Sequence, residues 1–339
     1  MATFSWTGDY GKYSAARHWG PRGVPGPGDT AVVANGQVVL RRQDVQATVL
    51  LGNSDPGAPP VLDLRNSSLS VLSMPDGLPQ PFNNTIPIVP GYATVNVRGD
   101  SSIGAIDVGD QLNTNRASDP FGHGPVGAPE TLTVNIAKGA TLTAGFDIKY
   151  RTDLTINGGD EALFNATDST IEGGKAVIHT PLGGQSTILM TNGPVEPTFS
   201  AVAGSLELGS SVGAGDTINV RMGHLMIDKP LEFLGRVDLF DNTDPAPGDR
   251  YSFGPQSILL KNIYATSFSF DDGSHVLTLF RGSDVLDQLR FTPGVTASFF
   301  EDSTALPGGT NVARTDNGVF IRGAFSLFPD NATVLPMQT

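Results

Sequence analysis

Carboxylates are the residues of this chain whose type could support catalysis, and their spacing limits what they could do. Hydrolysis of a glycosidic bond needs two carboxyl groups about 5 to 9 Å apart. Alternate residues of one strand would share a face, yet no two acidic residues are separated by two positions. Asp107 and Asp110 are three positions apart, so they could share a face only if Gly109 formed a bulge. Carboxylates on neighbouring strands could also meet, at a register that the sequence does not reveal.

A lyase needs a base and a cation close together. The most compact group that offers both is Lys149, Tyr150 and Arg151. This group joins Asp107 and Asp110 as the catalytic candidates of the chain. The simpler interpretation of Lys149 to Arg151, which we favour, is a solvated edge of a β-coil.

Two further motif matches have structural explanations. Ser211 lies in a Gly-x-Ser-x-Gly match at 209–213, but a nucleophile elbow must lead from a strand into a helix, and no helical pattern follows. Gly122, Gly124 and Gly127 have the spacing of a dinucleotide-binding loop inside a proline-rich segment that opens no helix. We interpret both matches as turns.

Two acidic segments could offer oxygen ligands to calcium, which takes roughly six to eight of them. One contains Asp160, Glu161 and Asp168, and the other contains Asp271 and Asp272. Neither matches an EF-hand loop or the glycine–aspartate nonapeptide of calcium β-rolls. Calcium could bind to these segments, but the default interpretation is that their carboxylates are solvated charges on loops. We expect that the protein requires no cofactor. The five histidines lack the short spacing of a zinc motif.

The net charge and the absence of cysteine limit the classes of binding partner and the cellular compartment that we expect. A formal charge of −13 repels phosphate backbones and anionic lipid, so we expect no nucleic-acid partner and no membrane insertion. The absence of cysteine excludes disulfides and is compatible with a secreted bacterial protein. The first ten residues lack the regions of a signal peptide, so we expect a removed leader or another export route.

Composition and patterning predict an all-β chain. The 41 glycines and 25 prolines show no Gly-X-Y period, and short alternating apolar runs recur between them. Helical periodicity is nearly absent, although 284–289 could form a short turn between strands. Strands are predicted through the middle of the chain at 131–136, 141–144, 154–156, 175–179, 187–190, 206–208, 217–220 and 225–227.

A strand and a short corner, repeated, build a solenoid in which each coil buries its inward residues against the next. We therefore predict a right-handed parallel β-helix, or β-solenoid. Residues 1–30 would form an N-terminal cap, and 31–250 would form the solenoid, with irregular loop insertions at 79–129. Antiparallel strands and a second cap would occupy 251–339.

Paired β-sandwich domains are the alternative fold, and their strands would pair mainly antiparallel. Two segments, FSFDDGSHVLTLF and VARTDNGVFIR, place a turn dipeptide between alternating runs and are predicted hairpins. The Asn35-Gly36 dipeptide would suit either a hairpin or a solenoid corner.

The 79–129 region carries prolines, amides and aromatic residues in long irregular excursions. Long loops on a rigid β scaffold are where ligand contacts collect. The ligand-binding candidates beside these loops are Tyr92, Asn113, Asn115, Arg116 and His123. Ordinary surface loops are the simpler interpretation.

Two glycine–aspartate–threonine segments and two early tryptophans have physical explanations. In Gly28-Asp29-Thr30 and Gly215-Asp216-Thr217, glycine allows a corner and aspartate can accept hydrogen bonds from the following amides. Trp6 and Trp19 would cover the edge strands of the first coil, and the alternative is an aromatic platform for sugars.

These segments also carry a resemblance to a family. The opening FSWTGDYGKYSAARHWGPRGVPGPGDTAVVANGQVVL and the later GAGDTINVRMGHLMIDKPLEFLGRVDLF resemble bacterial autotransporter-like and adhesin-like secreted surface proteins. The residues that carry the likeness at the N-terminal end are Trp6, Trp19, Val24, Pro25, Gly26, Gly28, Asp29 and Thr30. The resemblance covers roughly half of the chain and implies a β-solenoid. A full autotransporter would also contain a membrane-barrel segment, which residues 1–339 do not include.

The expected function is a secreted cell-surface or extracellular-matrix structural and adhesion protein that contacts a polysaccharide or a cell-surface glycan through loops. The alternative is a β-helical polysaccharide-degrading enzyme, either a glycoside hydrolase or a lyase. A phage or virion fibre component comes third. Self-association is a further expectation for such a rod.

Overall fold

The computed structural model describes residues 1–53, 55–74, 91–109, 130–149, 152–159, 161–191, 204–239, 256–301, 312–322 and 331–338. The predicted all-β class is confirmed, because strands hold 59% of the described residues and helices hold 4%. The chain divides into two compact units. The first unit is Met1–Ser169 with Gly174–Thr180, and the second is Thr170–Gly173 with Pro181–Thr339.

The first unit contains strands of two sheets, named here sheet A and sheet B. In spatial order, the strands of sheet A are β14 (Leu163–Ala166), β12 (Thr141–Ile148), β10 (Ser101–Val108), β8 (Ser68–Met74), β6 (Asp44–Leu51), β4 (Thr30–Val33), β1 (Thr3–Trp6) and β3 (Trp19–Gly20).

Sheet B is the second sheet of this unit. In spatial order, its strands here are β2 (Tyr10–Lys12), β5 (Gln37–Arg41), β7 (Val61–Arg65), β9 (Tyr92–Val97), β11 (Glu130–Ile136), β13 (Thr152–Gly158) and β16 (Lys175–Ile178).

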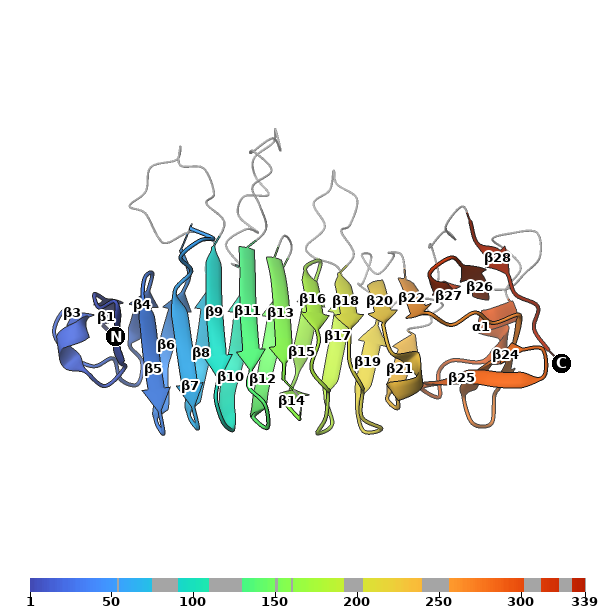
Figure 1. Ribbon diagram of the computed structural model, residues 1–339, viewed down its shortest axis with the longest axis horizontal. Coiled ribbons are helices and arrows are strands. Elements are labelled where there is room, and N and C mark those ends of the chain that lie inside the picture. Colours follow the sequence, from blue (N-terminus) through green and yellow to red (C-terminus); the bar gives the residue numbers. More distant parts are fainter. Residues whose placement is uncertain are drawn as a thin grey trace, which may run out of the picture. The chain divides into compact units, whose positions relative to one another are not determined.

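Successive strands from β4 to β13 alternate between sheet A and sheet B, and each pairs in parallel with the strand two places along the chain (Figure 1). This parallel pairing differs from the antiparallel pairing that the sandwich alternative requires. The Asn35-Gly36 dipeptide connects β4 to β5, which lie in different sheets, so it forms a corner and not a hairpin. Gly36 has a φ of 71°, which favours glycine.

Aligned inward residues form continuous apolar columns. One column in sheet B consists of side chains that are all 0% exposed: Val38, Leu62, Val95, Val134, Ile156 and Ile178. Each such side chain contributes about 1.5–3 kcal/mol by leaving water. The parallel register therefore places like residues from successive strands on top of one another.

Sheet A contains bulges that set the register near the ends of its strands. Between Ile103 and Ala105, β10 carries one residue more than β12, and this extra residue is Gly104. A Cβ atom on Gly104 would lie 2.5 Å from the backbone oxygen of Ser70 on β8. Glycine is required here because two backbones approach each other closely.

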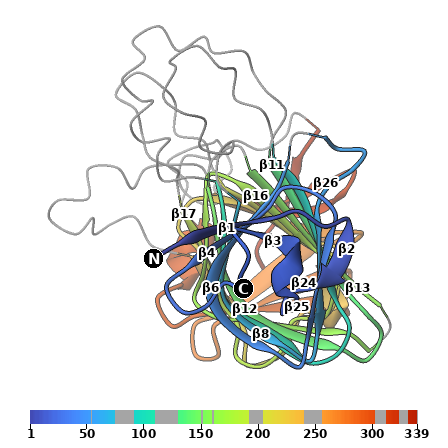
Figure 2. The same cartoon turned by 90° about the vertical axis from the view of Figure 1, so that its left-hand side faces the viewer.

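The N-terminal end of the first unit is closed by β1, β2, β3 and the short helix η1 (Ala16–His18). Figure 2 looks onto this end, with β4 and β6 of sheet A on one side and β13 of sheet B on the other. Trp6 and Trp19 are register partners, are 6% and 2% exposed, and meet edge to face with ring centroids 5.0 Å apart. Buried rings cannot serve as a sugar platform, so the structure favours the covering role over the alternative.

The second unit is described by itself. Its strands are β15 (Ser169–Glu172, from Thr170 on), β17 (Thr187–Thr191), β18 (Ser205–Leu208), β19 (Thr217–Val220), β20 (Gly223–Ile227), β21 (Arg236–Leu239), β22 (Gln256–Lys261), β23 (Ser267–Asp271), β24 (Val276–Arg281), β25 (Asp284–Phe291), β26 (Val312–Thr315), β27 (Gly318–Arg322) and β28 (Thr333–Val334). Two short helices, η3 (Pro230–Glu232) and α1 (Ala297–Glu301), complete it.

Both predicted hairpins are present in the second unit, since β23 pairs antiparallel with β24 and β26 pairs antiparallel with β27. The segment 284–289, considered as a short turn, is instead part of the strand β25. Its residues pair with β24 over the whole length of that strand, so cross-strand hydrogen bonding overrides the weak local pattern. The helix α1 was not predicted.

Candidate functional site

Two aspartates that are far apart in the sequence lie side by side in sheet A. Asp107 on β10 and Asp147 on β12 are direct register partners, and Ser73 on β8 is the partner of Asp107 on its other side. Neighbouring strands are about 4.8 Å apart, so the two carboxylate-bearing residues are adjacent. Both side chains are half-buried near the carboxyl ends of their strands. The two aspartates lie on neighbouring strands, and the sequence alone does not reveal the register of those strands.

Lys149 completes a cluster that we call the Asp107–Asp147–Lys149 site. Its Nζ atom lies 2.6 Å from Oδ2 of Asp147, and the side chains are 18% and 32% exposed. Oδ1 of Asp147 is buried and has no hydrogen-bond partner within the described ranges. Gly109, with a φ of 93°, passes so close that a Cβ atom there would lie 2.9 Å from Cβ of Lys149. The corner after β10 therefore packs directly against the first carbon of the Lys149 side chain.

The two carboxyl groups have different electrostatic environments. Burial is the main cause that raises the pKa of Asp107, the negative charge of Asp147 raises this pKa further, and Lys149 lowers it in part. Asp147 has the ammonium group of Lys149 as a direct counter-ion. Two adjacent carboxyl groups in different electrostatic environments, one with a raised pKa and one paired with a cation, are the arrangement that acid–base chemistry on a glycosidic bond uses.

The raised pKa gives a stability prediction for Asp107→Asn. Because the folded-state pKa lies above the ordinary 3.8, the charged form destabilises the fold above that raised pKa. The penalty disappears as pH falls through the raised pKa. Asparagine lacks the penalty, so we expect the free energy of unfolding at pH 7 to rise by roughly 0.5–1 kcal/mol, allowing for solvent screening.

Urea unfolding at pH 7 and at pH 3.5 checks this prediction, since the gain should be present at the higher pH and shrink at the lower one. The matched control is Asp9→Asn, which changes an exposed aspartate of the same unit, directly before β2. An Asp107→Asn variant that is less stable than the native chain at pH 7 would contradict the proposed environment.

The other catalytic and ligand candidates divide into two groups. Those that lie outside the described residues are Asp110, Tyr150, Arg151, Asn113, Asn115, Arg116 and His123. Tyr92 is described and lies half-buried at the start of β9, where it is the register partner of Thr131 on β11. Of the candidates, the structure brings Asp107 and Lys149 together through Asp147, a residue that sequence analysis did not single out.

The calcium candidates have other roles where the structure describes them, and Asp160 lies outside that part. Glu161 and Asp168 occupy turn positions with φ values of 61° and 46°. Asp271 accepts hydrogen bonds from Oγ of Ser274 and the Gly273 amide, which lower its pKa. Asp272 accepts one from the Ala297 amide at 2.6 Å. Across the described ranges, no three histidine, aspartate or glutamate side chains gather as a metal site would require.

The two glycine–aspartate–threonine segments form the same turn. Oδ2 of Asp29 accepts from the Gly26 amide at 3.1 Å, and Oδ2 of Asp216 accepts from the Gly213 amide at 2.9 Å. In each case Oδ1 accepts from the amide of a distant residue, at 2.8 Å for Asp29 and 2.7 Å for Asp216. The prediction that the following amides donate to these aspartates is wrong. One donor is the amide three residues before the aspartate, and the other is the amide of a distant segment. The aspartates stabilise corners, and the Ser211 motif beside Asp216 leads into strand β19, not into a helix.

One serine–histidine contact was not found from the sequence. Nδ1 of His224 lies 2.6 Å from Oγ of Ser257 in the second unit. Ser257 is only 3% exposed, so a substrate cannot reach its hydroxyl group. The contact therefore has a structural role.

Within the described residues, no helix has the length and apolar character needed to cross a membrane. Comparisons of this chain with protein-family models, with curated proteins and with solved structures give no match.

Proposed function

We propose that the chain is a secreted bacterial β-solenoid that acts as a cell-surface or matrix module and contacts polysaccharide. The alternation of strands between two parallel sheets supports the solenoid, because each pair of strands then constitutes one coil. An amide ladder also supports it. The side-chain amide of Asn135 donates to Asn96, and that of Asn157 donates to Asn135, both at 3.1 Å.

The observation that carries the binding function is an outward-facing row of polar side chains on sheet A, called here the polar row. Its five members are aligned on successive parallel strands: Asp44, Ser68, Ser102, Thr143 and Asn165. They are exposed or half-exposed. Hydroxyl, amide and carboxylate groups repeated at about 4.8 Å can hydrogen-bond the hydroxyls of an extended sugar chain.

A glycan array with two matched double variants tests this function. Ser102→Ala with Thr143→Val removes two hydroxyls from the centre of the polar row. Thr94→Val with Thr133→Val removes two aligned, half-exposed hydroxyls from sheet B. We expect the first variant to weaken polysaccharide binding by about tenfold and the second to leave it unchanged. Equal binding by the native chain and both variants would exclude the polar row.

A polysaccharide-degrading enzyme is the second candidate, and the Asp107–Asp147–Lys149 site is the observation that favours it. Asp107 would protonate the glycosidic oxygen, while Asp147 would act as nucleophile or would activate water. Every polysaccharide bound on the array is incubated with the protein, and new reducing ends and the absorbance of unsaturated sugars are measured. Cleavage that Asp107→Asn abolishes and Asp9→Asn retains would establish the enzyme, since Asp9 is an exposed aspartate outside the polar row, whereas binding without cleavage supports the adhesion module.

A further inference from the structure

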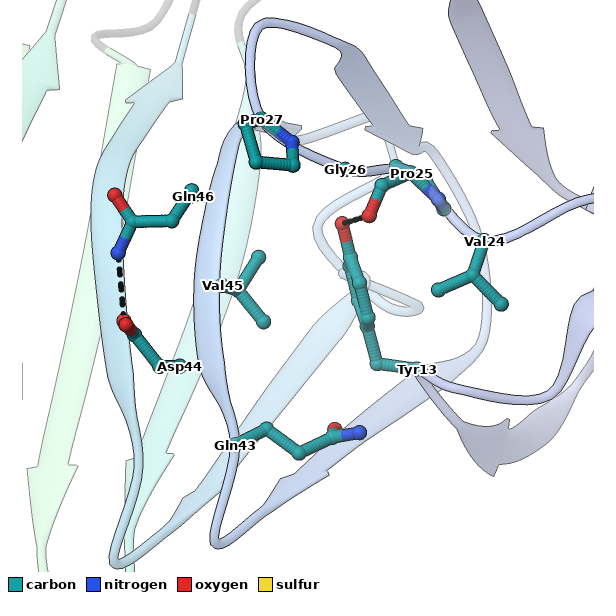
Figure 3. A pocket seen from close by; sticks show the side chains of 9 residues that line it. All are labelled: Tyr13, Val24, Pro25, Gly26, Pro27, Gln43, Asp44, Val45 and Gln46. Carbon is teal, nitrogen blue, oxygen red and sulfur yellow. Dashed lines mark hydrogen bonds between the residues drawn. The ribbon is translucent and has the colours of Figure 1, made fainter.

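A pocket of about 180 Å³ lies in the first unit beside the start of β6 (Figure 3). The residues that line it are Tyr13, Val24, Pro25, Gly26, Pro27, Gln43, Asp44, Val45 and Gln46. Three chain segments therefore build it: Tyr13 and residues 24–27 from the N-terminal end of the unit, and residues 43–46 from sheet A. None of them contributes to the Asp107–Asp147–Lys149 site.

The wall of the pocket combines apolar and polar groups, and Asp44 is the charged residue among those that line it. Val45 points toward Tyr13, with Val24 on the far side of the ring (Figure 3). The hydroxyl of Tyr13 donates to the Pro25 carbonyl at 3.1 Å, and this leaves the phenol oxygen able to accept. Burial raises the pKa of Tyr13, so the group stays neutral.

Two polar side chains of the β6 segment are already satisfied and face away from the tyrosine (Figure 3). The Gln46 amide donates to Oδ1 of Asp44 at 2.7 Å, and the Ser70 hydroxyl donates to Oε1 of Gln46 at 3.1 Å. The Ser68 hydroxyl donates to Asp44 at 2.6 Å. These hydrogen bonds link β6 to β8 and leave neither side chain without a partner on this side of the strand.

Gln43 differs from them. Its side chain lies on the same side of the strand as Tyr13 (Figure 3), and its Oε1 atom is buried with no hydrogen-bond partner among the described residues. A buried acceptor without a donor is costly, so a donor from outside the protein would stabilise it. A hydroxyl group is well suited, because it can donate a hydrogen bond to the carbonyl oxygen of Gln43.

The size and charge of the pocket restrict the ligand. Its volume corresponds to about six water molecules at roughly 30 Å³ each, and it is smaller than the roughly 300 Å³ at which drug-sized sites begin. Asp29 lies behind the Gly26 amide and Asp44 lies at the wall, so an anion is disfavoured. We propose that this pocket binds one neutral hydroxylated ligand, a single sugar residue or a small polyol, through a hydrogen bond to the carbonyl of Gln43. The proposal does not depend on the function proposed above.

Titration of the full chain with methyl glucoside, and separately with myo-inositol, tests the proposal by NMR of the glutamine side-chain amides. We expect a saturable shift of the Gln43 amide in the millimolar range for at least one of the two polyols. Cyclohexanol, which has a similar ring with a single hydroxyl, should bind more weakly. Gln43→Leu should weaken binding at least fivefold, as followed by ligand-observed saturation transfer.

Gln288→Leu is the matched control, because it makes the same change at an exposed glutamine of β25, outside the pocket, and should retain binding. Val24→Phe should fill the pocket and also abolish binding, while unfolding curves confirm that each variant is folded. The absence of a saturable shift with both polyols, or equal binding by Gln43→Leu, overturns the proposal and assigns the pocket to water.

Discussion

Phe164→Ala is expected to lower the free energy of unfolding of the first unit by about 3–5 kcal/mol. Phe164 is 0% exposed on β14, and its ring stacks on Phe146 with centroids 6.2 Å apart and an interplanar angle of 20°. Truncation would leave a cavity and remove this contact. Because Phe146 directly precedes Asp147 on β12, the wall behind the candidate site would loosen as well.

Urea unfolding followed by tryptophan fluorescence measures this loss, since both tryptophans of the chain lie in the first unit. Leu163→Ala is the matched control, because Leu163 is the neighbouring residue on the same strand and is not fully buried. It should cost clearly less. Equal losses from the two variants would show that β14 does not pack as described.

Gly104→Ala is expected to cost about 1–3 kcal/mol, although it adds a single methyl group. The new Cβ atom would lie 2.5 Å from the Ser70 oxygen, and because that oxygen belongs to the backbone, β8 and β10 must move apart. The movement would also displace Asp107, three residues further along β10. We therefore expect the raised pKa of Asp107 to fall toward its ordinary value, as measured by NMR titration of its side-chain carboxyl group.

Gly294→Ala provides the control for this substitution. A Cβ atom at Gly294 meets nothing within 4 Å, and the residue is exposed, so the stability should hardly change. A Gly104→Ala variant with native stability and an unchanged Asp107 pKa would mean that the two strands do not approach as closely as the structure shows.

Local patterning was sufficient to predict many of the strands between residues 131 and 227. The alternating residues of β11, β13 and β19 identify strands because period-two burial is a property of each segment alone. The segment 284–289 was misjudged for the converse reason: its pattern is weak, and β25 is specified by pairing with β24. Strict alternation was not read everywhere, because β9 and β10 lie within the 79–129 segment that was assigned wholly to irregular loops.

The candidate site could be predicted only in part. Asp107 and Lys149 were singled out from local composition, but Asp147 becomes their neighbour through the register of β10 and β12. That register depends on the connection between the strands and on the extra residue Gly104, and neither leaves a periodic signal. The Asn35-Gly36 corner was ambiguous for a similar reason, since its backbone conformation suits a hairpin and a corner equally.

Successive strands of sheet A stack in parallel and in a fixed register, and disulfide formation between introduced cysteines tests this stacking. The chain has no cysteine of its own. Ser102 on β10 and Thr143 on β12 are register partners, so the Ser102→Cys, Thr143→Cys variant should cross-link on mild oxidation. In the Ser102→Cys, Thr141→Cys variant the two cysteines are offset by two residues, so their Cα atoms lie farther apart than the roughly 7 Å that a disulfide can span. This variant should not cross-link. Cross-linking of the offset pair in place of the aligned pair would contradict the register that brings Asp107 to Asp147.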